Sequence, residues 1–189
     1  MIITQTNINN VLILEPSIYK DARGYFFESF NQRAFNDAVG REVLFVQDNQ
    51  SVSKYGVLRG LHYQLNNPQG KLVRVTEGEV LDVAVDLRLN SPTFGQHVSV
   101  VLSSENNKQL WIPEGLAHGF IVRSKTATFA YKTTDYWNSS DEHTIKWNDE
   151  TLNINWNDQR SQFQRSILSP DVSAKDNDGN AFKDSKYFN

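Results

Sequence analysis

The amino-acid sequence predicts an all-β fold, either an antiparallel sandwich or a jelly roll. Short apolar runs rich in β-branched and aromatic residues recur roughly every 8 to 12 residues, and turn-forming residues separate them. Almost no helix is expected. With 189 residues the chain can bury a substantial core, so we expect a single domain over residues 1–189 with a partly irregular tail at residues 169–189.

The N-terminal part of the chain is predicted to contain short strands and one helix. Residues 2–6 and 11–14 are extended runs, and the aromatic run at residues 25–30 follows a turn and alternates between two faces. A helix is expected to begin at Asn31, which can cap it, and to end at Gly40. Because this helix is short, we expect its apolar face to cover the edge of a sheet.

The middle of the chain is predicted to form a β-hairpin or a near-hairpin. Two apolar runs, residues 57–65 and 72–75, flank the turn-forming sequence NNPQG at residues 66–70. Ahead of them, residues 43–46 are interpreted as a strand, and the four polar residues 47–50 are interpreted as a turn.

Residues 79–87 alternate with a period of two, which is typical of a strand. One face is apolar and is assigned to the core; it consists of Leu81, Val83, Val85 and Leu87. The opposite face carries Asp82 and Asp86, which point either to solvent or into a polar cavity. Further strands are expected at residues 97–102, 109–113, 120–122 and 126–134.

Charge and composition exclude several classes of function. The net charge of −3 and the pI of 5.8 argue against a basic surface that binds a nucleic-acid polymer. The absence of cysteine excludes disulfides, thiolate nucleophiles and cysteine-bound metals. The N-terminus lacks the basic and apolar regions of a signal peptide, and nowhere do about 18 apolar residues run together. We therefore expect a cytoplasmic protein without a membrane span.

In a jelly roll, side chains from several strands converge in the barrel interior, which makes that space the natural site. The candidates there are His62, Lys71, Asp82, His118 and Tyr131. A metal site in such a barrel usually needs two histidines at positions i and i+2. Residue 64 is a glutamine, and the other histidines are isolated, so we predict no metal.

Proton-transfer chemistry is what these candidates can perform. A histidine base, a tyrosine acid and a lysine that stabilises an oxyanion form a complete set for removing a proton α to a carbonyl. An epimerase needs its base and its acid on opposite faces of one carbon. Two facing sheets can supply that geometry.

Several long motifs resemble those of the dTDP-4-dehydrorhamnose 3,5-epimerase family. The similarity runs in order from about residue 2 to residue 156 and resumes near residues 173–176. The motifs are DARG at 21–24, FFE at 26–28, VQDN at 46–49, VLRGLHYQ at 57–64, QGKLV at 69–73, residues 78–88, WIPEGLAHGF at 111–120 and YKTT at 131–134.

The resemblance implies a cupin-type jelly roll with short flanking helices that acts as a homodimer without cofactor or metal. It implies conversion of dTDP-4-dehydro-6-deoxy-D-glucose to dTDP-4-dehydro-L-rhamnose, a step of the dTDP-L-rhamnose biosynthesis that serves carbohydrates such as O-antigen. By the same resemblance, His62 is the general base, Tyr131 is the acid and Lys71 stabilises the enolate. Asp176 pairs with the histidine.

The resemblance also implies a set of substrate contacts. Phe26 and Tyr136 are expected near the thymine base, and Lys175 is expected to contact the nucleotide-sugar. The remaining positions that match substrate contacts in relatives are Arg23, Glu28, Gln47, Asn49, Arg59, His118 and Glu142, in addition to Lys71.

Two local features leave alternatives open. The polar insert at residues 157–169 is longer than the family pattern, and Asp171 competes with Asp176 as the partner of His62. In an unbroken strand Arg59 and His62 point to opposite faces, so a bulge at Gly60 is expected if both belong to the site.

Alternatives also remain for the activity and the assembly. Relatives that epimerise only C3 or only C5 share much of this scaffold, and a barrel of this kind can also serve as a non-catalytic module that binds a nucleotide-sugar. For the homodimer, we expect the N-terminal strands and residues 25–30 to exchange between subunits and cover a sheet edge.

Overall fold

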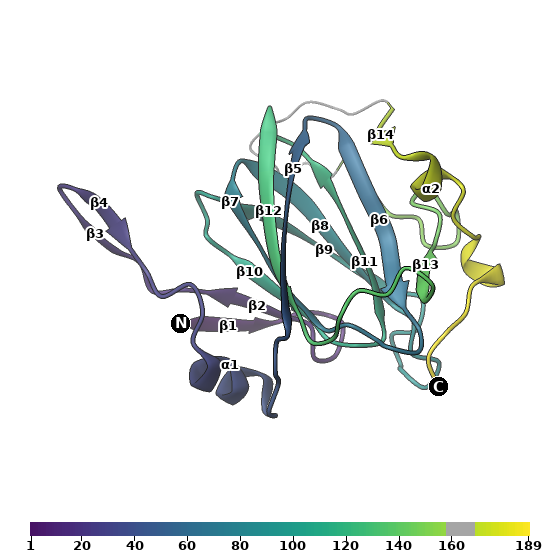
Figure 1. The fold of residues 1–189 in the computed structure, drawn as a ribbon, viewed down its shortest axis with the longest axis horizontal. Helices are drawn as coiled ribbons and strands as arrows, with labels where there is room; N and C mark the ends of the chain where they lie inside the picture. The colour runs from purple at the N-terminus through teal and green to yellow at the C-terminus, as the bar shows by residue number, and fades with distance from the viewer. Residues whose placement is uncertain (158–168) are drawn as a thin grey trace.

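Two antiparallel β-sheets face each other and form the body of the molecule (Figure 1). The computed structural model describes residues 1–157 and 169–189. The first sheet contains, in spatial order, β1 (Ile2–Gln5), β2 (Leu12–Glu15), β10 (Gln109–Ile112), β7 (Lys71–Glu77), β12 (Thr126–Thr133) and β5 (Gln47–Lys54). The second contains β13 (Glu142–Thr144), β6 (Val57–Gln64), β11 (Leu116–Val122), β8 (Glu79–Asp86) and β9 (His97–Ser103). The predicted all-β jelly roll is confirmed.

The main core lies between the two sheets. It consists of apolar side chains from both inner faces, among them Val73 of β7, Ala84 of β8 and Leu102 of β9. Phe120 of β11 and Phe129 of β12 stack across the gap, with ring centroids 4.2 Å apart and planes at 15°. This stacked pair joins the two sheets and forms one wall of the cavity described below.

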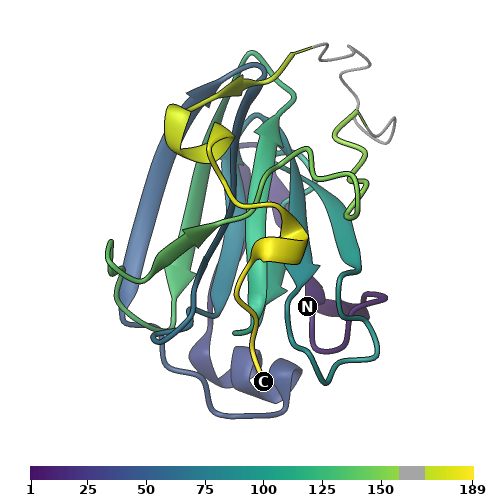
Figure 2. The ribbon, with the colours of Figure 1, turned by 90° about the vertical axis from the view of Figure 1, so that its right-hand side faces the viewer.

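The outer face of the second sheet is buried as well, because the C-terminal tail crosses it (Figure 2). The tail contains β14 (Asp171–Val172), which pairs with β6 in parallel, then α2 (Ala174–Asn177) and the 3₁₀-helix η1 (Phe182–Asp184). Phe182 packs on the apolar row of this face. The insert at residues 157–169 lies almost wholly outside the described residues.

Burial on both faces decides where the carboxylates of β8 point. Leu81 and Val83 face the tail, and Asp82 lies on the opposite face, inside the barrel, where its side chain is completely buried. Asp86, at the end of the strand, accepts hydrogen bonds from Arg88. Of the two alternatives predicted for this face, solvent or a polar cavity, the structure shows the cavity for Asp82. Neither Asp82 nor Asp86 faces solvent.

The predicted helix is α1 (Gln32–Val39), and its caps are those expected. The Asn31 side chain accepts a hydrogen bond from the backbone N–H of Ala34, and Gly40 ends the helix with a φ of 72°. The helix does not cover a sheet edge as predicted. Phe35 packs on the outer face of the first sheet instead, with its ring centroid 5.2 Å from that of Trp111 in β10.

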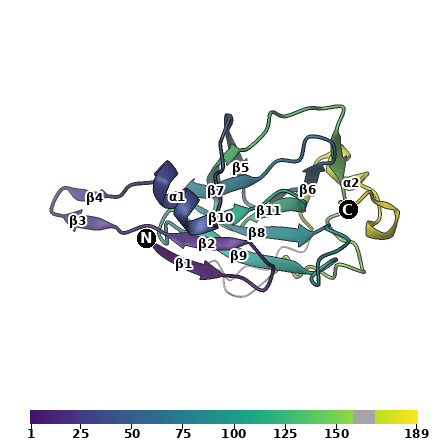
Figure 3. The same ribbon diagram turned by 90° about the horizontal axis from the view of Figure 1, so that it is seen from below.

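A two-stranded arm, β3 (Tyr19–Asp21) and β4 (Gly24–Phe26), projects away from the sheets (Figures 1 and 3). The predicted strand over residues 25–30 is wrong beyond Phe26, because the chain there turns back to the body. Phe30 then joins Phe35 in the cluster under α1, with ring centroids 5.9 Å apart.

Polar residues 47–50 form the start of β5, so both the turn predicted there and the strand predicted at residues 43–46 are wrong. β5 is the edge strand of the first sheet and pairs only with β12 within the described sheet. One side of β5 faces the open end of the barrel and the other faces the outer surface. The side chains on neither side of β5 need to be apolar. Its sequence therefore lacks the alternation of apolar and polar residues that usually identifies a strand.

The predicted hairpin of residues 57–65 and 72–75 is also wrong. These runs are β6 and β7, and they belong to different sheets. The turn-forming residues 66–70 carry the chain across from one sheet to the other, where side chains of the neighbouring loop hold them in place. In the part of the chain that the structure describes, no helix is long and apolar enough to cross a membrane.

Candidate active site

A cavity of about 290 Å³ lies between the sheets at the open end of the barrel. Five strands line it: β5, β6, β7, β11 and β12. Its polar lining includes Asn49, Arg59, His62, Lys71, His118 and Tyr131. The structure thus brings together six of the residues that the sequence suggested.

A β-bulge allows Arg59 and His62 to face this cavity together. β11 pairs His118 with His62 and Phe120 with Arg59, so β6 carries one extra residue between the two pairs. Gly60 takes a φ of +121°, and a Cβ at this position would lie 2.5 Å from the Cα of Gly119. The bulge predicted at Gly60 is confirmed, and only glycine fits there.

His62 forms a close pair with Asp176 from the C-terminal tail, with 2.5 Å between Nε2 and Oδ1. Ser173 caps α2 and, through its hydroxyl, accepts the N–H of Asp176. Burial alone would raise the pKa of Asp176, but the hydrogen bond and charge of His62 hold it below its usual value. Because an ionised carboxylate only accepts, Nε2 of His62 donates this hydrogen bond, and in the neutral imidazole the lone pair is then on Nδ1. Asp171 lies in β14 and does not contact His62.

A second histidine–aspartate pair lies deeper in the barrel. His118 is 7% exposed and its Nε2 lies 2.9 Å from Oδ2 of Asp82, while its ring stacks on Phe129 at 5.9 Å. Burial lowers the pKa of His118, so the ring is neutral at pH 7 and donates to the carboxylate. His118 therefore presents a hydrogen-bond acceptor rather than a charge.

Lys71 and Tyr131 lie on the first sheet, across the cavity from His62. Lys71 begins β7, and burial lowers its pKa to about 8, although Glu142 and Asp82 act in the opposite direction. Among the described residues, no carboxylate lies within ion-pair distance of its ammonium group. Burial raises the pKa of Tyr131, so its phenol is protonated at neutral pH. The two walls thus carry a base on one side and a protonated acid and a cation on the other.

Other predicted residues belong to segments next to those that line the cavity, and we call these segments its rim. Glu142 of β13 forms a short ion pair with Lys175 of α2, and Gln47 donates to Asn49 at 2.9 Å. Tyr136 is 63% exposed and follows β12. The rim therefore combines charged, amide and aromatic groups.

Three predicted residues do not reach the cavity of their own chain. Arg23 and Phe26 belong to the projecting arm, where Arg23 pairs with Asp21 at 2.6 Å and Phe26 is 71% exposed. Glu28 follows the arm and lines a separate surface pocket beside Phe26. A single copy of the chain therefore does not bring all the predicted substrate-binding residues to one cavity.

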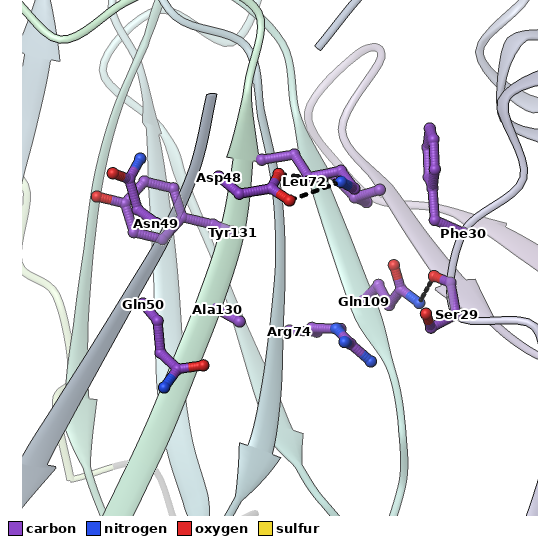
Figure 4. A pocket seen from close by; sticks show the side chains of 11 residues that line it. Ser29, Phe30, Asp48, Asn49, Gln50, Leu72, Arg74, Gln109, Ala130 and Tyr131 are labelled. Atoms are coloured by element: carbon purple, nitrogen blue, oxygen red, sulfur yellow. Dashed lines mark hydrogen bonds and ion pairs between the residues drawn. The ribbon is translucent and has the colours of Figure 1, made fainter. Parts of the chain in front are cut away.

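A further cavity, of about 420 Å³, lies on the other side of the first sheet (Figure 4). There Asp48 pairs with Lys132 at 2.9 Å, and Gln109 donates to the backbone oxygen of Ser29 at 2.7 Å. No histidine lines it, so it lacks a base that titrates near neutral pH. The smaller cavity between the sheets is the better candidate for proton transfer.

Two buried residues at the rim were not assigned to the site from the sequence. They are Gln64, at the position where a metal site would need a second histidine, and Asp141, in the loop before β13. Both bind loop backbone: Gln64 through its amide, and Asp141 through the N–H groups of Asn66 and Asn67. Neither has a local sequence signal, because the groups they bind are brought near only by the fold.

Several known proteins are similar to this chain in sequence and in fold. A family model described as dTDP-4-dehydrorhamnose 3,5-epimerase matches residues 5–184. The chain is 55% identical over 185 residues to an enzyme of that name from Pseudomonas aeruginosa, covering 98% of each chain. A crystal structure of dTDP-6-deoxy-D-glucose-3,5-epimerase from Legionella pneumophila, in complex with dTDP-4-keto-L-rhamnose, superposes with a TM-score of 0.89 at 48% identity, covering 97% of this chain and 94% of that one. A 3'-monoepimerase from Streptomyces bikiniensis in complex with dTDP-quinovose gives a TM-score of 0.83 at 32% identity, covering 93% and 85%.

Proposed function

The chain belongs to the dTDP-4-dehydrorhamnose 3,5-epimerase family, and from this premise we propose the roles of its residues. The protein is an isomerase of a nucleotide-linked keto sugar. It converts dTDP-4-dehydro-6-deoxy-D-glucose to dTDP-4-dehydro-L-rhamnose by inverting C3 and C5. The observation that carries the residue roles is that His62 faces Lys71 and Tyr131 across one cavity.

The reaction begins with the C4 ketone, which acidifies the C–H bonds at C3 and C5. Nδ1 of His62 takes the proton, and the electron pair of the C–H bond moves to the C4 oxygen to form an enolate. The ammonium of Lys71 stabilises the negative oxygen. Tyr131 then donates its phenolic proton to the opposite face of the carbon, the enolate returns to the ketone, and the configuration is inverted. The tyrosinate and the imidazolium regain their resting states by proton exchange with solvent.

Asp176 assists the base in two ways. It holds His62 with Nε2 protonated, so that Nδ1 is available, and its negative charge stabilises the imidazolium that forms. General acid–base catalysis typically contributes about 10²–10⁴-fold, so the contact to the enolate oxygen must supply a comparable or larger share.

The nucleotide part of the substrate is assigned to the rim. Arg59 and Lys175 are the cations for the diphosphate, because guanidinium and ammonium groups bind phosphate oxygens well. Tyr136 is assigned to the thymine base as a stacking partner. The other groups assigned to the substrate are Gln47, Asn49, His118 and Glu142.

We further propose a homodimer in which the arm of one subunit reaches the cavity of the other. Arg23, Phe26 and Glu28 would then contact substrate in the partner's site. The support is that the arm projects from its own chain and exposes Tyr19 and Tyr25 as well as Phe26 to solvent. Analytical ultracentrifugation tests this proposal, because a species of 21.6 kDa at micromolar concentration contradicts it.

A second candidate is an epimerase that inverts one carbon only. It is favoured by the Streptomyces bikiniensis 3'-monoepimerase, which shares this fold. NMR analysis of the product made by the wild-type protein separates the two candidates, because the vicinal couplings report the configuration at C3 and C5 independently. The assigned role of His62 requires that His62→Ala bind dTDP normally yet form no product. Product formation at the wild-type rate by that variant would refute the role.

A further inference from the structure

Gln64 connects the strand that carries His62 to the segment that follows the strand of Tyr131. It is the last residue of β6 and is 3% exposed. Its Nε2 donates to the backbone oxygens of Asn67 at 2.7 Å and Tyr136 at 3.2 Å, and its Oε1 accepts the N–H of Asn138 at 2.8 Å. One side chain thus joins the end of a strand in the second sheet to the chain leaving the first sheet.

The loops that Gln64 joins are bound to each other as well. Asp141 accepts the backbone N–H groups of Asn66 and Asn67 and the side-chain amide of Asn66, at distances from 2.6 to 3.1 Å. Gly70 and Thr134 exchange hydrogen bonds at 2.8 and 3.0 Å. Residues 66–70 and 134–141 are therefore bound to each other, and Gln64 ties both segments to the end of β6, beside the ladder in which β13 pairs with β6.

Side-chain contacts link β6 to the first sheet on both sides of His62. β6 and the β12–β5 edge belong to different sheets, and among residues 1–157 and 169–189 no ladder of backbone hydrogen bonds joins them directly. On one side of His62, Arg59 reaches β5 through Ser53 at 3.1 Å. On the other side, Gln64 binds the segment that follows β12, at Tyr136 and Asn138. Together with the direct connection from β5 to β6 at residues 55–56, these side-chain contacts link the two walls of the cavity on either side of His62.

We propose that Gln64 is a positioning residue that sets the separation between His62 and Tyr131. The inference rests on the proposed roles of these two residues. A proton removed by His62 has two fates: the imidazolium returns a proton to the same face, or Tyr131 delivers one to the opposite face. The second fate requires both groups at contact distance from one carbon, and a misplacement of about 1 Å can cost about 10²-fold in rate. A wider cavity therefore lowers inversion more than proton exchange.

The test compares two rates in D₂O: deuterium incorporation into the starting sugar and formation of the inverted product, both followed by NMR. Gln64→Met removes all three hydrogen bonds at similar size, and Gln64→Glu retains the acceptor for Asn138 but loses both donations. We expect inversion to fall about 10- to 100-fold while exchange falls less than about threefold, which raises the ratio of exchange to inversion at least severalfold.

Asn106 provides a matched control. Its side chain also makes three hydrogen bonds, to the backbone of Val101, Ser103 and Lys108, but in the turn between β9 and β10, away from the cavity. Asn106→Leu should lower the melting temperature without changing the ratio. Equal falls of exchange and inversion in both Gln64 variants would overturn the inference and leave Gln64 a structural residue. The absence of exchange and inversion in the wild type would instead overturn the proposed function itself.

Discussion

The charge on Lys71 predicts how the activity depends on pH. Its pKa of about 8 means that the ammonium is lost as pH rises through that value, whereas the phenol of Tyr131 stays protonated because burial raises its pKa. A neutral amine cannot stabilise the enolate electrostatically. Since about one tenth of Lys71 remains charged one unit above its pKa, kcat/KM should fall about tenfold for each pH unit above roughly 8.

The contribution of Lys71 to the free energy of unfolding should change with pH in the direction opposite to the activity. The pKa is lowered from 10.5 to about 8, which corresponds to about 3 kcal/mol against the charged folded state. Between these two values the unfolded chain binds more protons than the folded one, so the contribution of Lys71 to stability increases with pH. Deprotonation of Lys71 therefore does not destabilise the folded protein, and an alkaline loss of activity with this pKa reflects the lost charge.

The assay is kcat/KM for epimerisation between pH 6 and pH 10, with the melting temperature measured in each buffer. Lys71→Met should have low activity throughout and should lack the alkaline decrease. A wild-type profile that stays flat to pH 9.5, or a decrease that persists in Lys71→Met, would refute the reasoning.

Three further outcomes are expected. Asp176→Asn keeps the shape of the side chain but removes its charge, so turnover should fall about 100-fold with dTDP binding retained in calorimetry; a loss below threefold would contradict its role. Tyr131→Phe should retain deuterium exchange but form no inverted product, and normal inversion would exclude Tyr131 as the acid. Phe35→Ala should lower the free energy of unfolding by about 3–4 kcal/mol in urea titrations while kcat of the folded protein stays within twofold, because Phe35 packs in the cluster under α1, away from the cavity. A loss below 1 kcal/mol would mean that this cluster contributes little.

Local sequence signals predicted most of the strands and the caps of α1. Alternation placed Leu81 and Asp82 on opposite faces of β8 because a strand buried on both sides still separates its apolar and polar rows. The bulge at Gly60 was expected because the family resemblance assigns both Arg59 and His62 to the site, and the pairing of β6 with β11 confirms it. The alternation in β8 and the caps of α1 depend on neighbours along the chain, so the local sequence specifies them.

Pairing between distant segments could not be predicted in the same way. A turn-forming loop does not reveal whether it closes a hairpin or crosses between sheets, and residues 66–70 cross because Asp141 and Thr134 bind them there. Residues 47–50 lacked a strand pattern because an edge strand at a cavity needs no apolar row. The contact of Asp176 with His62 depends on the path of the tail, which the spacing of residues does not encode.

Deuterium incorporation at C3 and C5 of dTDP-4-dehydro-6-deoxy-D-glucose, followed by NMR in D₂O, tests the central assignment most directly. The account predicts that the wild-type protein exchanges both positions and that His62→Ala exchanges neither, while both proteins bind dTDP with similar affinity. Exchange at both carbons by His62→Ala would contradict the account, because another group would then have to be the base.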